Sequence, residues 1–230
     1  MLDSERVYVD LLFCASKKYA SWDLEVVVKV GDWGRITKGK RGLAFWRKNG
    51  TFLREGNIFL DGKAENYNIP TPVEYGNDSE GETWVTSKNA KQIDFSASAG
   101  TGYRLALSAH WRCGAVLAME NAMITLIEHP GLLKPLLRNP IMRGVVIVSE
   151  VHSCSSYARL LTTDGGGTVA LGLRVETPGV VSTDANARWV RNTTSGNFKS
   201  HVNKSGNRSF YPLYRLVAHS EDEISTGIGG

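Results

Sequence analysis

Three residues with reactive side chains alternate along one stretch of the chain: Glu150, His152 and Cys154. Alternate residues of a β-strand lie on the same face, so a strand here would bring the three side chains together. A cysteine beside a histidine can form a nucleophile and its base, and the same atoms bind transition metals. Residues two apart on one strand seldom have the geometry for base activation, and nothing supplies an oxyanion hole or a third ligand. The sequence therefore predicts no enzyme, no cofactor and no metal site.

A second chemical signal is the run KGKRGLAFWRKNG, residues 38–50, in which five cations surround an aromatic pair. No acidic residue occurs between Asp32 and Glu55. Three interpretations are open: the run tracks phosphates and stacks bases of a nucleic acid, it docks on an anionic membrane, or its aromatics are core and its cations a solvated rim. The cations are Lys38, Lys40, Arg41, Arg47 and Lys48, and the aromatics are Phe45 and Trp46.

Composition places the chain among globular proteins. It has 230 residues, 42% of them hydrophobic, with a net charge of +4 that is modest for a duplex-DNA binder. Its three cysteines are widely spaced without a CxxC pair, which favours free or buried thiols in a reducing cytosol. We expect no signal peptide, because residues 1–10 lack an apolar core, and no apolar run approaches a membrane-spanning helix. The whole chain is expected to form one domain.

The elements that position these residues are read from periodicity. Residues 4–20 predict an amphipathic helix, with Val7, Leu11 and Ala15 four apart and Lys17 and Lys18 in the last turn. β-Branched residues 23–30 predict a strand. Further strand is expected over 56–69, interrupted at Asp61-Gly62, followed by a loop over 70–82.

Alternation of apolar and polar residues is longest over residues 93–111. Ordinary strands have about 5–6 residues, whereas a membrane-spanning strand needs about 9–11 with one lipid face and one polar face. One long bent strand, or two strands broken at Gly100-Thr101-Gly102, would also explain the pattern. The apolar side of the alternation comprises Ile93, Phe95, Ala97, Ala99, Thr101, Tyr103, Leu105, Leu107, Ala109 and Trp111.

Beyond this segment, residues 115–128 predict a helix, and a proline-containing basic connector completes the region 115–143. Residues 144–161 and 168–176 predict a β-hairpin around the turn DGGG at 164–167. A final strand is expected over 210–218. Together the pattern predicts an α+β fold with a twisted, mainly antiparallel sheet and packed helices.

The order of these features resembles the pore-forming N-terminal domain of the gasdermin family. The features are the N-terminal helix, the basic aromatic loop, the long alternating segment, the stretch ENAMITLIEHPGLLKPLLRNPIMR with the strand RGVVIVSEVHSCS, and a second amphipathic hairpin. We expect the protein to lack the long C-terminal inhibitory domain and the cleavage linker of the animal members. The chain is therefore most similar to the short fungal gasdermin-like regulators of cell death.

This resemblance implies a protein that binds anionic phospholipids, oligomerises and perforates the plasma membrane as a transmembrane β-barrel, causing lytic, pyroptosis-like cell death. The implied trigger is an allelic partner, as in fungal allorecognition and heterokaryon incompatibility, rather than proteolysis. The protein would be cytoplasmic when inactive and at the plasma membrane when assembled, as a homo- or hetero-oligomer and without nucleic acid. Two hairpin regions, 57–108 and 144–177, would insert into the membrane.

Site residues follow from the same resemblance. The lipid-binding residues would be Lys17, Lys18, Lys38, Lys40, Arg41, Phe45, Trp46, Arg47, Lys48, Arg138 and Arg143. The membrane-inserting strands would carry Phe95, Tyr103, Leu105, Leu107, Val169, Leu171 and Leu173. Two alternatives stay open: a nucleic-acid-binding α+β module that uses the 38–48 loop, and a lipid-binding protein that does not perforate the membrane.

Overall fold

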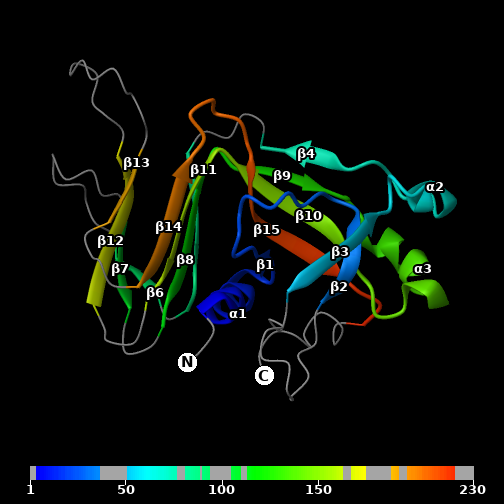
Figure 1. Cartoon of the computed structure of the whole chain (residues 1–230), viewed down its shortest axis with the longest axis horizontal. Coiled ribbons are helices and arrows are strands. Elements are labelled where there is room, and N and C mark those ends of the chain that lie inside the picture. The colour runs from blue at the N-terminus through cyan, green and yellow to red at the C-terminus, as the bar shows by residue number, and fades with distance from the viewer. Residues whose placement is uncertain are drawn as a thin grey trace.

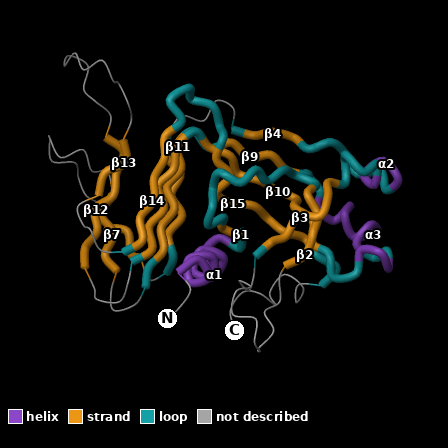
Figure 2. The backbone as a smooth tube through the Cα atoms, in the orientation of Figure 1, coloured by secondary structure: helices purple, strands orange, loops and turns teal. Residues whose placement is uncertain are grey.

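The structure is a computed structural model, and it describes residues 4–36, 51–76, 81–88, 90–93, 105–109, 113–162, 167–174, 188–191 and 196–220. Within these ranges all strand pairs are antiparallel and form three sheets, and the helices are short (Figures 1 and 2). The helices are α1 (Ser4–Ser16), α2 (Lys63–Asn66) and α3 (Lys134–Leu137), with 3-10 turns at Pro130–Leu133 and Pro140–Met142. The expected α+β class is confirmed.

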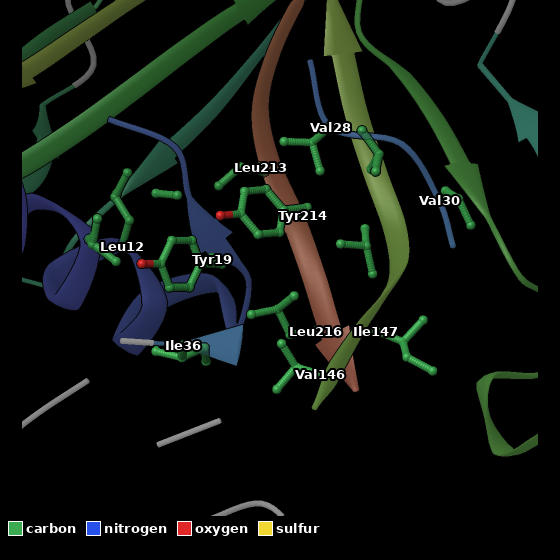
Figure 3. Packing of buried hydrophobic residues seen from close by; sticks show 14 of the residues in the cluster. Leu12, Tyr19, Val28, Val30, Ile36, Val146, Ile147, Leu213, Tyr214 and Leu216 are labelled. Carbon is green, nitrogen blue, oxygen red and sulfur yellow. The ribbon is translucent and has the colours of Figure 1, made fainter. Parts of the chain in front are cut away.

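The first sheet is built around strand β10 (Val146–Cys154), whose nine residues are all buried. Its strand order is β1-β15-β10-β2-β3, with β9 paired to β10 and β4 paired to β9. The strands are β1 (Tyr19–Ala20), β2 (Asp32–Ile36), β3 (Phe52–Asn57), β4 (Val73–Tyr75), β9 (Met123–Leu126) and β15 (Phe210–Val217). Figure 3 shows apolar side chains of β1, β10 and β15 meeting in the core, where Tyr19 stacks on Tyr214 with ring centroids 5.0 Å apart.

The second and third sheets have four strands each, in the orders β14-β11-β8-β5 and β13-β12-β7-β6. The second sheet contains β5 (Glu82–Thr86), β8 (Ala115–Glu120), β11 (Ser156–Leu161) and β14 (Asn197–Val202). The third contains β6 (Ala90–Ile93), β7 (Leu105–Ala109), β12 (Gly167–Arg174) and β13 (Arg188–Arg191). Each strand of the third sheet is therefore the neighbour in sequence of the equivalently placed strand of the second.

These two sheets share one hydrogen-bond register through their central strands. Ala109 pairs with Gly167 at the end of one ladder, and Ala115 pairs with Leu161 at the start of the next. Five residues separate the two pairs on either strand, so the register passes from one sheet to the other without a shift. The two sheets therefore share their register along the central strands, whereas the flanking pairs shift by three residues from β5–β8 to β6–β7 and by four from β14–β11 to β13–β12. The four strands taken together are called the ribbon below, and Figure 1 draws the third sheet beside the second rather than as its extension.

The helix expected over 115–128 is wrong. The segment forms β8 and β9, and Asn121 turns the chain between them with a positive φ of 53°. Five of the six β8 residues are buried, because α1 covers one face and a small apolar cluster with Ala90 lies on the other. A strand buried on both faces has no alternation, so its sequence cannot be distinguished from a buried helix.

Two expected strands are also wrong. Residues 23–30 make turn bonds instead, such as Val26 N–H to the Asp23 carbonyl at 3.2 Å, and Val26 remains 56% exposed. Over 56–69 only the end of β3 is strand: Gly62 adopts a left-handed conformation and α2 follows. The loop expected over 70–82 contains β4. Turn bonds have overridden the β-propensity of the valines.

The pairing expected for residues 144–161 with 168–176 does not occur in the described backbone. β10 belongs to the first sheet, β11 pairs with β8 and β14, and β12 pairs with β7 and β13. The alternating segment 93–111 contributes to two antiparallel strands, since Ile93 at the end of β6 pairs with Ala106 of β7. Its central residues, 94–104, lie outside the described ranges. The final strand is confirmed as β15.

Candidate lipid-binding surface

The basic segment is carried by the hairpin of β2 and β3. Its ends are fixed by the register, in which Ile36 pairs with Phe52 and Asp32 with Asn57. Residues 37–50 lie outside the described ranges. They include seven of the predicted lipid contacts: Lys38, Lys40, Arg41, Phe45, Trp46, Arg47 and Lys48.

The base of this hairpin is held by a buried carboxylate. Asp32 is fully buried; its Oδ1 accepts hydrogen bonds from Asn57 Nδ2 at 2.9 Å and Arg54 Nε at 2.9 Å, and its Oδ2 accepts one from the Lys29 amide at 2.8 Å. At the bulge next to it, a Cβ on Gly34 would lie 1.8 Å from the Leu53 carbonyl oxygen. Only glycine permits so close a strand approach, so the basic segment starts from a rigid base.

A cavity lined by both apolar and charged side chains adjoins that base. It has a volume of about 290 Å³ and lies between α1, the chain after β1 and the β2–β3 hairpin. The Phe52 ring lies 5.9 Å from Tyr214, which connects the hairpin to the main core. The aromatic and aliphatic lining residues are Val9, Tyr19, Trp22, Val26, Val27, Val28, Phe52 and Tyr214.

Helix α1 is confirmed but ends earlier than expected. It stops at Ser16, and Lys17 turns the chain with a positive φ of 57°. Its buried residues are Tyr8, Val9 and Leu12, whereas Ala15 is exposed. The buried face is therefore rotated from the one expected, and Lys17 is exposed just beyond the helix.

Lys18 lies in a buried polar cluster rather than at the surface. Its Nζ is 2.5 Å from Glu150 Oε1 and 2.6 Å from His152 Nε2, and its side chain is 18% exposed. Arg215 Nε completes the cluster at 3.3 Å from Glu150 Oε2. The hydrogen bond from His152, followed by the contact with Lys18, lowers the pKa of Glu150 to about 2 against the opposing effect of burial. While Lys18 is bound to Glu150 and His152, its side chain stabilises the fold and does not face a lipid surface.

The lowered pKa of Glu150 makes the free energy of unfolding decrease at acid pH. Because its folded pKa lies below the ordinary 4.5, its contribution is complete above about 4.5 and is lost as the pH falls toward 2. We expect Glu150→Gln to lower the free energy of unfolding by about 3 kcal/mol at neutral pH, since the Lys18 charge loses its partner. Urea unfolding should show the difference between wild type and variant shrinking in acid; a difference that does not change with pH would contradict this.

Arg138 and Arg143 are exposed on the connector around α3, as is Lys134. Leu132 and Ile141 of the same connector are 40% and 80% exposed, and no acidic residue occurs between Glu128 and Glu150. The connector is anchored underneath by Leu133, Leu136, Leu137 and Met142, all buried. It presents cations with apolar side chains, which suits an anionic membrane surface.

The structure brings together strand residues that the sequence assigned to separate hairpins. In the backbone register Leu105 pairs with Leu171 and Leu107 with Val169, across β7 and β12. Leu173 pairs with Trp189 of β13. Phe95 and Tyr103 lie outside the described residues.

Sequence reasoning missed the full length of the alternation. With 115–120 recognised as strand, the apolar odd-numbered series continues from residue 105 to residue 119. The series is Leu105, Leu107, Ala109, Trp111, Cys113, Ala115, Leu117 and Met119. Within β8 the even-numbered Val116 and Ala118 are apolar too, so the alternation cannot be read there from the sequence, and the strand pairing identifies it. Trp22, Glu25 and Arg159, which connect the N-terminal region to the second sheet, carry no sequence signal of their own.

The reactive trio on β10 has no catalytic geometry. Cys154 is buried, and burial raises the pKa of its thiol to about 12, so the thiolate is scarce at neutral pH. His152 is occupied by Glu150 and Lys18. Among the described residues, no group of three or more His, Cys, Asp or Glu side chains is arranged to hold a metal ion.

No protein-family model matches the chain, and no curated protein matches it. Among solved structures, the chain is similar to the cryo-EM structure of the gasdermin A3 membrane pore, with 11% identity and a TM-score of 0.30 over 94% of this chain and 89% of that one. No helix in the described ranges has the length and apolar character needed to cross a bilayer.

Proposed function

We propose that the protein is a membrane pore former that binds anionic phospholipids, oligomerises and inserts the four-stranded ribbon into the bilayer. The observation that carries this proposal is that two described ladders of the central strands keep one register: Leu105–Ala109 with Gly167–Leu171, and Ala115–Glu120 with Ser156–Leu161. Joined, the two central strands would cover residues 105–120 and 156–174. Straightened, these strands would have 16 and 19 residues, more than the about 9–11 that a spanning strand needs. The flanking strands would cover 82–93 and 188–202.

The two central strands also have the composition that a bilayer requires. Odd-numbered residues from 105 to 119 are apolar, and Val169, Leu171, Leu173 and Val175 continue the series on the neighbouring strand. Arg159, the register partner of Leu117, is the charged exception on this side of the ribbon. Even-numbered residues are mostly small or polar, for example Ser108, His110, Arg112, Thr168 and Arg174. One face of a straightened ribbon would meet lipid and the other water. Subunits closing into a ring would leave no strand edge in lipid.

Refined insertion regions follow from the strand pairing. The ribbon supports hairpins of residues 82–120 and 156–202 in place of 57–108 and 144–177. β10 stays outside them, because its nine buried residues form the centre of the first sheet. In this proposal the first sheet keeps its structure while the strands of the ribbon rearrange.

Lipid attraction comes from cations on separate elements. Each Lys or Arg near an anionic surface contributes about 1 kcal/mol, so the five cations of the basic segment would supply several. Phe45 and Trp46 between them would insert at the headgroup level, where aromatic side chains are favoured. The exposed Lys17, Arg138 and Arg143 would add contacts with lipid headgroups. Lys18 would bind lipid only if its ion pair with Glu150 opens.

The biological setting is proposed from the family resemblance. An encounter with an allelic partner would trigger assembly of a homo- or hetero-oligomer at the plasma membrane from a cytoplasmic inactive form, and the outcome would be lytic cell death. Mixing the protein with a candidate partner before adding it to vesicles tests this trigger.

Dye release from vesicles tests the function itself. We expect release from vesicles that contain anionic lipid, alone or with the partner, little release from neutral vesicles, and ring-shaped oligomers on the membrane. Vesicle binding without release would favour a lipid-binding protein that does not perforate. Binding to single-stranded nucleic acid but not to vesicles would overturn the proposal in favour of the nucleic-acid module.

A further inference from the structure

The N-terminal region covers one face of the second sheet. This region, here called the N-terminal clasp, comprises α1, β1 and residues 21–27. Helix α1 packs on β5 and β8, and its Tyr8 and Leu12 share a buried core with Leu117, Met119 and Tyr157 of the sheet. Helix α1 and the loop after it therefore cover the face of the ribbon that would have to become free for the ribbon to straighten.

A buried charge lies beneath the clasp. Arg159 of β11 is 6% exposed, and its guanidinium carbon lies 3.4 Å from the centroid of the Trp22 ring. In the described part of the chain, its Nε and Nη1 and the Tyr8 hydroxyl are buried with no hydrogen-bond partner. Burial lowers the pKa of Arg159. The contact between Arg159 and Trp22 holds the clasp on the sheet. Burying a charge whose N–H groups lack partners is unfavourable, and this penalty opposes the closed position of the clasp.

Acidic residues of the clasp contact two further basic side chains beside Arg159, Lys199 and His201. Glu25 Oε1 lies 3.0 Å from Lys199 Nζ and 3.5 Å from His201 Nδ1, and it accepts a hydrogen bond from the Tyr157 hydroxyl at 3.2 Å. Asp23 lies 3.6 Å from the same Lys199. Lys199 is the direct cross-strand partner of Arg159 in the β11–β14 ladder. Like charges directly opposite each other destabilise a sheet. Negative groups that contact Arg159 and Lys199 on this face of the second sheet therefore stabilise it.

We propose that the N-terminal clasp is an autoinhibitory element in which Asp23 and Glu25 occupy a cationic face of the second sheet that anionic lipid headgroups take over. This inference rests on the proposed pore function. A phosphate that replaces Glu25 at Lys199 and His201 removes the contacts of Asp23 and Glu25 with the second sheet. Trp22 and the apolar face of α1 then hold the clasp on that sheet, while β1 and Lys18 keep it attached to the first sheet. Departure of α1 exposes β5 and β8, and the ribbon can straighten.

The test compares two single charge removals. Glu25→Gln and Glu65→Gln each remove one exposed carboxylate, but Glu65 is on α2 and outside the clasp. We expect Glu25→Gln to release dye about fivefold faster than wild type, while Glu65→Gln does not. Hydrogen exchange without lipid should show α1 amides exchanging faster in Glu25→Gln, with β10 amides unchanged. Equal exchange and equal release in the two variants would overturn the clasp.

A second variant, Arg159→Met, is expected to favour the closed position of the clasp. Arg159→Met keeps an unbranched side chain under Trp22 and removes the unsatisfied N–H groups, so α1 amides should exchange more slowly than in wild type. Faster exchange in this variant would overturn the role given to the buried charge. If wild type itself releases no dye, the pore function fails, while the exchange experiment without lipid still decides whether the clasp opens.

Discussion

Reversing three cations of the basic segment is expected to weaken binding to anionic vesicles by about a hundredfold. Lys40, Arg47 and Lys48 replaced by Glu lose about 1 kcal/mol of attraction each, and every 1.4 kcal/mol is tenfold. The new carboxylates are also repelled by the surface, so about a hundredfold is the smaller end of the effect. Dye release should fall with binding, and the difference should shrink as salt screens the charges.

The matched control reverses Lys29, Lys63 and Lys204, three lysines outside both the predicted lipid contacts and the proposed insertion regions. Three reversals change the charge by six, so either triple variant goes from +4 to −2. The control should bind within about threefold of wild type, since its cations lie away from the proposed contact. Vesicle co-sedimentation measures both. Equal losses would show that net charge, rather than this segment, attracts the protein.

A lysine on the apolar side of the ribbon is expected to abolish dye release while leaving vesicle binding intact. Leu107→Lys would place one charge per subunit in lipid, at about 2–4 kcal/mol near the bilayer midplane. A ring repeats that cost in every subunit, so we expect release to fall by more than about a hundredfold. Binding should persist, because the basic segment is unchanged.

Ser108→Lys is the matched control, adjacent on the same strand and identical in added charge. Its side chain would face water in the straightened ribbon, so release should stay within about threefold of wild type. The same contrast is expected on the neighbouring strand between Val169→Lys and Thr168→Lys, since Val169 pairs with Leu107. Thermal unfolding in solution checks that all four variants fold. Loss of release in both members of a pair would contradict a two-faced ribbon.

The sequence alone determined the features that depend on neighbouring residues. The α+β class, helix α1, the final strand and the basic segment with its aromatic pair were all predicted from composition and period. The helix and the strand each have one less buried face, and the basic segment is a run of charges, so a short stretch of sequence is enough to recognise their patterns. The cations of the connector were also predicted, and the structure places Arg138 and Arg143 at the surface.

Only the tertiary structure decided what depends on residues far apart. β8 has no readable period because it is buried on both faces, and the partner of β11 is β8, not the next strand in sequence. Lys18 was expected at the surface, but Glu150, over a hundred residues away, binds its ammonium in the interior. The clasp depends on Trp22 meeting Arg159. Burial and long-range pairing set these outcomes, and neither is a property of a local stretch of sequence.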